Sequence, residues 1–122
     1  DNWAAEGATG WSYSDVLPYF KKSETLQRGN QIPESPLNRS VHGSTGPLTV
    51  SVKEPVNPVA ENFVRSSTKL GLEIGDYNDG SMNGKVSLMQ QTIREGSRCD
   101  TATAFLRAAG KRNNLTIAVN SH

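Results

Sequence analysis

The sequence predicts a small mixed domain of helices and strands, of the α+β or α/β class. Three segments carry helix-capping residues and an apolar helical period, and the segments between them alternate apolar and polar residues as strands do. In chain order the elements read helix, loop, strand, helix, turn, strand, helix, strand, with no internal repeat. The 122 residues suffice for one small domain.

The composition is poor in core-forming residues. Hydrophobic residues make up 34% of the chain, and the mean hydropathy is -0.56. A chain of this size buries roughly two-thirds of its unfolded surface, so we expect a fragment whose hydrophobic faces are completed elsewhere in a larger protein. The chain begins without Met and ends directly after an apolar run, which fits that expectation.

The first predicted helix covers Tyr13 to Ser23. Ser12 is a suitable N-cap, and Asp15 completes a capping-box spacing. Its apolar face is formed by side chains at helical intervals: Tyr13, Val16, Leu17 and Phe20. This part of the chain is rich in aromatic residues, but it lacks the interleaved basic residues of a nucleic-acid stacking surface. We therefore expect the aromatic side chains to pack against a neighbouring domain: Trp3, Trp11, Tyr13, Tyr19 and Phe20.

Residues 25–44 are predicted to form a polar loop without a helical or strand period. A long structureless loop in a compact domain is uncommon unless it is functional or forms a lid. His42 lies near the end of this loop. A single loop histidine can be a surface residue, a hydrogen-bonding clip or a catalytic base, and the sequence leaves these roles open.

A half-buried strand is predicted next, because Leu48, Val50 and Val52 alternate with polar residues. Asn57-Pro58 then opens a second helix, with Asn as the N-cap and Pro in the first turn. Its predicted buried face consists of Val59, Phe63, Val64 and Leu70, and Gly71 is predicted to follow it in the left-handed conformation.

Residues 76–84, DYNDGSMNG, are dense in turn-forming residues and superficially suggest a calcium loop. An EF-hand loop needs Gly at its sixth position and Glu at its twelfth. Counted from Asp76, these positions hold Ser81 and Ser87, so the sequence predicts a turn and no metal site.

The last third of the chain reads as strand, tight turn, helix and strand. The strand covers Val86 to Arg94, and Glu95-Gly96-Ser97 turns the chain. Asp100 or Thr101 caps a helix that runs to about Ala109, with a narrow apolar face of Ala102, Phe105, Leu106 and Ala109. A final strand is predicted with Leu115, Ile117 and Val119 facing inward.

Charge and residue usage exclude some classes of function. Thirteen Lys and Arg against twelve Asp and Glu give a net charge of +1, which argues against a nucleic-acid or anionic-membrane surface. The single cysteine, Cys99, cannot form an internal disulfide. Two glycosylation sequons begin at Asn38 and Asn114, and they matter only in a secreted chain. No apolar run reaches the roughly 18 residues of a membrane span, and the compartment cannot be read.

The sequence contains no complete catalytic, metal-binding or cofactor-binding motif, and no residue is assigned to such a role. It has neither the G-x-G-x-x-G cradle of dinucleotide-binding folds nor a Walker loop. Arg98 and a helix start beside Cys99 could activate the thiol, but only His42 and His122 could serve as its base, so an inert thiol is the expectation. Several carboxylates show no pairing that sequence alone establishes: Glu54, Glu61, Glu73, Asp76 and Asp79.

Four blocks, in order, resemble the glucose–methanol–choline (GMC) family of FAD-dependent oxidoreductases. The first is DNWAAEGATGWSYSDVLPYFKKSE at residues 1–24, and the second is HGSTGPLTV at 42–50. The helix and turn of residues 57–84 are a looser likeness. The fourth is QQTIREGSRCDTATAFL at 90–106, with the segment at 112–119 that follows it. The likeness is strongest to choline-dehydrogenase-like and insect glucose-dehydrogenase-like members, and Asp100 stands where the family usually has Ser.

The resemblance implies an internal fragment of a two-domain flavoenzyme that uses FAD to oxidise a CH–OH group of a choline- or sugar-like alcohol by hydride transfer. It implies a lid-side helix at 1–24, a loop at 25–45, part of a substrate-domain sheet at 46–97, and a helix and strand at 98–122 that return to the FAD domain. The family's dinucleotide fingerprint and catalytic histidine fall outside this chain, so the fragment alone is expected to be inactive. The competing hypothesis is a small non-catalytic binding or interaction module derived from that family.

Overall fold

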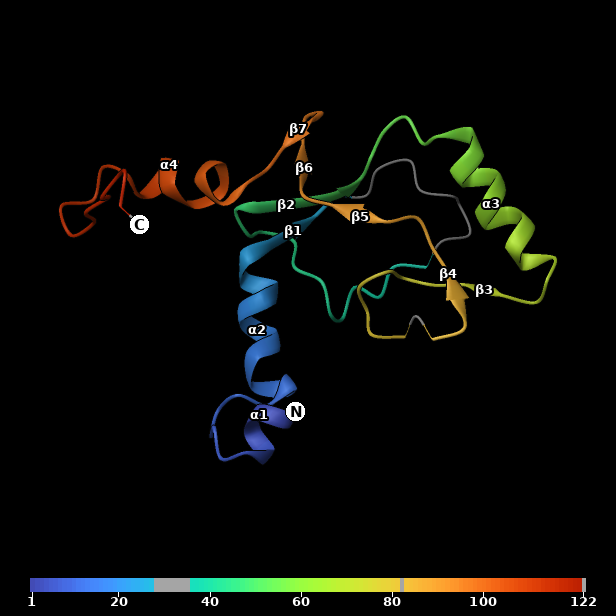
Figure 1. Cartoon of the computed structure of the whole chain (residues 1–122), viewed down its shortest axis with the longest axis horizontal. Helices are drawn as coiled ribbons and strands as arrows, with labels where there is room; N and C mark the ends of the chain where they lie inside the picture. Colours follow the sequence, from blue (N-terminus) through green and yellow to red (C-terminus); the bar gives the residue numbers. More distant parts are fainter. Residues whose placement is uncertain (28–35, 82, 122) are drawn as a thin grey trace.

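The computed structural model describes residues 1–27, 36–81 and 83–121. It is a mixed assembly of helices and short sheets, as the sequence predicts. Strands β1 (Glu24–Leu26), β2 (Leu48–Val52) and β5 (Gln90–Gln91) form the central sheet. In it, β1 runs parallel to β2, and β5 runs antiparallel to β2. Helix α2 (Tyr13–Ser23) projects from the sheet and carries α1 (Asn2–Ala5) near its far end, whereas α3 (Pro58–Thr68) lies on the other side (Figure 1).

Two smaller strand pairs complete the β-structure. Strands β3 (Glu73–Ile74) and β4 (Lys85–Val86) are parallel, and the predicted turn of residues 76–84 connects them. Strands β6 (Ile93–Arg94) and β7 (Ser97–Arg98) form a hairpin. Its two turn residues, Glu95 and Gly96, both have positive φ, as a tight two-residue hairpin requires.

Local capping fixes the helices where the sequence places them. Ser12 and Asp15 form the predicted capping box, and α2 has the predicted bounds. The side chain of Asn57 caps α3, and Pro58 occupies its first turn. Asp100 accepts a hydrogen bond from the Thr103 amide at 2.7 Å and thereby caps the third predicted helix. That helix begins as the π-helical segment η1 (Ala102–Leu106) and ends as α4 (Arg107–Ala109), a change of winding that the sequence did not predict.

Two strand predictions were wrong. The first strand, β1, begins at Glu24 and extends into the predicted loop of residues 25–44; the sequence did not predict it because its three residues depend on pairing with β2 more than twenty positions away. The single strand predicted over Val86 to Arg94 is instead divided among β4, β5 and β6, which pair with three different partners.

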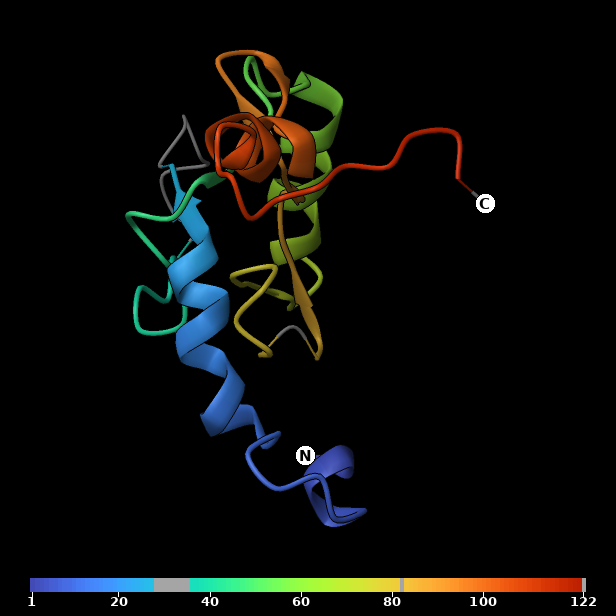
Figure 2. The ribbon, with the colours of Figure 1, turned by 90° about the vertical axis from the view of Figure 1, so that its left-hand side faces the viewer.

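The final strand predicted over 115–119 is also absent, since no described strand lies beside it. Ile117 and Val119 are exposed rather than inward-facing. In both views this segment runs away from the sheets (Figures 1 and 2).

The core is small, and several predicted buried faces point outward. Its buried members are Val52, Val64, Val86 and Leu88. Of the face predicted for α3, only Val64 is buried, and the exposed members are Val59, Phe63 and Leu70. In η1 the buried residue is Ala104, whereas Ala102, Phe105 and Leu106 are exposed and Ala109 is only partly buried. On α2, Phe20 is exposed and Val16 and Leu17 are only half-buried.

The burial of β2 is also different from the prediction. Thr49 and Ser51 are buried, while Leu48 and Val50 are half-buried. The hairpin and η1 cover this face, and its hydroxyls are hydrogen bonded: Arg94 Nε donates to Thr49 Oγ1 at 2.9 Å, and Ser51 Oγ donates to the Ile93 carbonyl at 3.2 Å. A polar strand face can therefore be buried because its polar groups have partners. No helix in the described residues is long and apolar enough to cross a membrane.

Candidate functional site

A buried cluster of ionisable side chains lies between the end of α2 and the turn after β3. The Nδ1 atom of His42 is 3.0 Å from Oε1 of Glu24, and Nε2 is 3.0 Å from Oδ2 of Asp76. The exposed fractions of these side chains are 5% for His42, 16% for Glu24 and 0% for Asp76. An imidazole that carries a proton on each nitrogen donates to both ionised carboxylates in this arrangement.

The carboxylate of Asp76 accepts several further hydrogen bonds. The backbone amide of Asn38 donates to Oδ2 at 2.9 Å, and Nε2 of Gln90 donates to Oδ1 at 2.9 Å. The amide of Asn78 also donates to Oδ1, at 3.2 Å. These donors satisfy the buried carboxylate, as the burial of a charge requires. Asp76 therefore joins the loop before His42 to its own turn and to β5.

Two glycines position His42 against the end of α2. A Cβ atom on Gly43 would overlap the carbonyl oxygens of Lys21 and Glu24, and one on Gly46 would overlap the backbone of Ser23. The amide of Gly43 donates to Oε2 of Glu24 at 2.8 Å. Only a residue without a side chain permits this approach, so local sequence fixes where His42 meets its partners.

The geometry of His42 fits a clip rather than a general base. Both of its ring nitrogens are engaged by carboxylates, so neither can take a proton from a substrate while the cluster is intact. The cluster ties α2, the loop before β2, the turn after β3 and β5 into one unit. Sequence reasoning missed Glu24 and did not pair Asp76 with a histidine, because these residues lie 18 and 34 positions from His42.

Cys99 is fully buried and does not lie at an accessible site. Its Sγ atom is 4.0 Å from the carbonyl oxygen of Pro47, and its backbone amide donates to the Thr92 carbonyl at 2.8 Å. Arg94 also donates to the Pro47 carbonyl. The thiol is thus packed where the hairpin meets β2, and its possible partner His122 lies outside the described residues.

The other predicted candidates are not brought together with His42. Asp79 makes local turn contacts, and the hydrogen bond from the Ser81 hydroxyl at 2.6 Å, helped by the Ser81 amide, holds the pKa of Asp79 below its ordinary value. Glu61 forms an exposed pair with Arg65 on α3. Glu73 is an exposed residue of β3. Within the described residues, no group of three or more His, Cys, Asp or Glu side chains is arranged to hold a metal ion.

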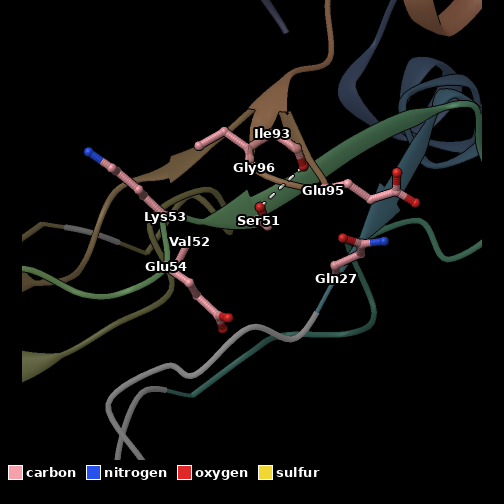
Figure 3. A pocket seen from close by; sticks show the side chains of 8 residues that line it. All are labelled: Gln27, Ser51, Val52, Lys53, Glu54, Ile93, Glu95 and Gly96. Atoms are coloured by element: carbon pink, nitrogen blue, oxygen red, sulfur yellow. Dashed lines mark hydrogen bonds between the residues drawn. The ribbon is translucent and has the colours of Figure 1, made fainter.

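An open pocket of about 560 Å³ lies between the end of β1, the end of β2 and the hairpin (Figure 3). Its lining is mostly polar and includes two carboxylates, from Glu54 and Glu95, and the ammonium group of Lys53. The full lining consists of Gln27, Ser51, Val52, Lys53, Glu54, Ile93, Glu95 and Gly96. The Ser51 hydroxyl is hydrogen bonded to the Ile93 carbonyl, and Lys53 points away from Gln27 and Glu95 (Figure 3). The lining can hydrogen bond a hydroxylated ligand, but it contains no histidine and no cysteine.

Comparison with known proteins finds a family model and several relatives that match this chain. The family model described as "GMC oxidoreductase" matches residues 1–122. The oxygen-dependent choline dehydrogenase of Brucella canis is 37% identical over 117 residues, which are 96% of this chain and 20% of that protein. The glucose dehydrogenase [FAD, quinone] of Drosophila melanogaster is 38% identical over 122 residues, which are 99% of this chain and 18% of that protein. The chain thus spans about a fifth of the length of these curated relatives.

Two solved structures are similar to this one. An FAD-dependent oxidoreductase from Chaetomium thermophilum superposes with a TM-score of 0.73 at 28% identity, covering 93% of this chain and 20% of that chain. A pyridoxine 4-oxidase from Mesorbium loti superposes with a TM-score of 0.69 at 33% identity, covering 88% of this chain and 20% of that chain.

Proposed function

The chain belongs to the GMC oxidoreductase family, and from this premise we propose that the full-length protein binds FAD and oxidises a CH–OH group of an alcohol. The observation that carries the proposal is the family match over every residue of the chain, with relatives named choline dehydrogenase and glucose dehydrogenase. These names favour a choline-like or sugar-like alcohol as the substrate. When bound, the flavin supplies the hydride acceptor.

The described residues do not fit a binding site for the FAD pyrophosphate. Such a site uses a helix N-terminus with free backbone amides behind a glycine-rich loop. The N-terminus of α2 is closed by Ser12 and Asp15, and that of α3 by Asn57 and Pro58. The helix that begins with η1 carries the Asp100 carboxylate at its start, and this negative charge would repel a phosphate. We therefore assign the residues that hold the pyrophosphate to parts of the polypeptide outside this chain.

We further propose the division of the chain that the resemblance implies. Residues 1–24 contain the lid-side helix, residues 46–97 form part of the substrate-domain sheet, and residues 98–122 form the return to the FAD domain. The intervening segment, predicted as a loop at 25–45, begins with β1 instead. The projection of α2 from the sheet and the exposed residues 116–119 support this division. In this scheme the His42 cluster has a positioning role, because it fixes the end of the lid-side helix to the sheet.

The decisive experiment is purification of the full-length protein. We expect the flavin absorbance near ~450 nm, and we expect it to bleach when choline or glucose is added without oxygen. The isolated chain of residues 1–122 is the control and should retain no flavin. A full-length protein that stays colourless after reconstitution with FAD would refute the proposal.

The open pocket favours one alternative, a small binding or interaction module that shares ancestry with the family but has no catalytic role. This alternative predicts that residues 1–122 alone form a compact monomer that unfolds in one sharp transition. Poor cooperativity on melting of the isolated chain would instead favour a fragment of the enzyme.

A further inference from the structure

An apolar groove lies along α1 and α2 and ends at Ser23, beside Glu24 of the His42 cluster. This aromatic groove has a volume of about 500 Å³ and is lined by Trp3, Gly10, Trp11, Val16, Tyr19, Phe20 and Ser23. None of its lining side chains is charged. Its four aromatic side chains are between 55% and 71% exposed. Large apolar groups gathered in this way on one surface are typical of an interface.

The groove is a formed surface rather than a loose chain end. The rings of Trp3 and Trp11 meet edge to face, with centroids 5.7 Å apart and planes at 77°. The Asp1 carboxylate accepts a hydrogen bond from the Tyr13 amide at 2.6 Å and so holds α1 against the start of α2. The capping box at Ser12 fixes the turn between the two helices. The aromatic side chains therefore have defined positions before anything covers them.

The polar groups of the aromatic side chains in the groove lack hydrogen-bond partners, whereas the Ser23 hydroxyl donates to the Phe20 carbonyl at 2.8 Å. Within residues 1–27, 36–81 and 83–121, no hydrogen bond engages the indole N–H of Trp3 or Trp11, or the hydroxyl of Tyr19. Buried Trp and Tyr side chains normally use these groups. A partner surface that fits the groove is therefore apolar with a few hydrogen-bond acceptors, which is the chemistry of an ordinary protein interior and not that of a phosphate-rich surface.

The length of the related chains identifies the occupant. This chain corresponds to 20% of the Chaetomium thermophilum structure, with 93% of its own residues superposed. About four-fifths of a protein of that length therefore lies outside the part represented by this chain. Helix α2 contributes no buried residue to the described structure, and it projects from the sheet (Figures 1 and 2). Its aromatic residues Tyr13, Tyr19 and Phe20 are exposed. It is thus available to that remaining polypeptide.

We propose that, in the full-length protein, residues of the same polypeptide outside this chain cover the aromatic groove and accept hydrogen bonds from its indole N–H groups. This interface goes beyond the proposed oxidation of an alcohol and does not depend on it. It also accounts for the small number of buried apolar residues in this chain, because further hydrophobic contacts are completed across the groove.

Hydroxyl-radical footprinting of the full-length protein, read by mass spectrometry, tests the proposal. We expect Trp3, Trp11 and Tyr19 to be oxidised several-fold more slowly in the native protein than in the same protein unfolded in urea. The protection must be present in dilute protein without lipid, and it can be measured with or without bound flavin. Oxidation at the unfolded rate would overturn the proposal. Protection that appears only at high protein concentration would overturn it in favour of a second copy, and protection that needs phosphatidylcholine–phosphatidylserine vesicles would overturn it in favour of a membrane surface.

A matched pair of variants gives an independent readout. Phe20 lines the groove, whereas Lys22 is an exposed residue of the same helix that does not line it. If the groove is covered, Phe20→Ser lowers the thermal midpoint of the full-length protein by several degrees, and Lys22→Ser leaves it nearly unchanged. Equal, small effects of the two substitutions would show that Phe20 remains in solvent and would overturn the proposal.

Discussion

Removal of the His42 side chain tests whether the buried cluster holds the fold together. In His42→Ala, the carboxylates of Glu24 and Asp76 each lose a donor at 3.0 Å. The two carboxylates then face each other across the space that the imidazole filled. Because the three residues come from three separate segments, the loss weakens the attachment of α2 to the sheet and of the sheet to the turn after β3.

The size of the effect follows from the burial of the two carboxylates. Removing one partner of a buried ion pair typically costs about 3–5 kcal/mol. Glu24 is still 16% exposed, and Asp76 keeps donors from Asn38, Asn78 and Gln90, so part of the lost stabilisation is retained. We therefore expect His42→Ala to lower the free energy of unfolding by about 3 kcal/mol, at the low end of that range.

Urea unfolding of the full-length protein, followed by circular dichroism, measures this change. Arg39→Ala is the matched control, because Arg39 is an exposed residue of the same loop and its loss should change the free energy by less than about 0.5 kcal/mol. His42→Ala combined with Glu24→Gln should be less destabilised than His42→Ala alone, since the second change removes one of the facing charges and its amide oxygen can still accept the hydrogen bond from the Gly43 amide. A loss below about 1 kcal/mol for His42→Ala would contradict the clip, because a broken buried pair costs more than that.

Three further substitutions test other contacts of the same region. Arg94→Lys keeps the charge but cannot reproduce the two hydrogen bonds of the guanidinium to β2 and to the loop before it, and we expect a loss of about 1–3 kcal/mol in urea unfolding. Gly43→Ala places a methyl group on the carbonyl oxygens at the end of α2, which should cost at least about 2 kcal/mol. In Gly110→Ala the new methyl group meets a single carbonyl oxygen, that of Leu106, at 3.1 Å, so a shift of a few tenths of an ångström suffices and the loss in the same assay should be clearly smaller. The backbone amide of Thr103 holds the pKa of Asp100 below its ordinary value of 3.8. The ionised Asp100 side chain therefore stabilises the folded state above pH 3.8, and this contribution is lost as the pH falls through the lower pKa of the folded state. We expect Asp100→Asn to flatten the acid limb of a curve of unfolding free energy against pH.

Features determined by neighbouring residues could be predicted from the sequence. The bounds of α2 follow from Ser12 and Asp15, and the start of α3 follows from Asn57-Pro58. The hairpin turn at Glu95-Gly96 is equally local. In each case the hydrogen bonds that decide the structure lie within four residues of one another, so no distant partner can overrule them.

Features determined by distant partners could not be predicted. The strand β1 exists because β2 lies beside it, and residues 115–119 remain unpaired because no described strand does. The outward-facing Phe63 and Phe20 violate a rule that assumes each apolar helix face packs within its own chain. That assumption fails for a chain that spans a fifth of its relatives. The buried polar face of β2 was missed for a related reason, since Arg94 satisfies Thr49 from 45 residues away.

The candidate site shows the same difference between features set by neighbouring residues and features set by distant partners. The sequence singles out His42 as a possible clip, but it contains no sign that Glu24 and Asp76 are the residues it joins. A recognisable signal is present only in the spacing H-G-x-x-G, because its two glycines require a close approach to another backbone. The two acidic partners can be identified only from the folded structure, in which this close approach places the end of α2 beside the imidazole.

The block at residues 42–50 therefore has a structural explanation that does not involve catalysis. Its histidine joins two carboxylates, its glycines fit against the end of α2, the carbonyl of Pro47 receives Arg94, and its Thr49 is buried beneath the hairpin. Each position serves the joint where a projecting helix, a parallel strand pair and a hairpin meet. A likeness to the family in this block is thus a likeness of architecture. The alcohol oxidation that we propose for the full-length protein has to be sought outside this block. The joint itself should tolerate substitutions only when they preserve its hydrogen bonds and its close backbone contacts.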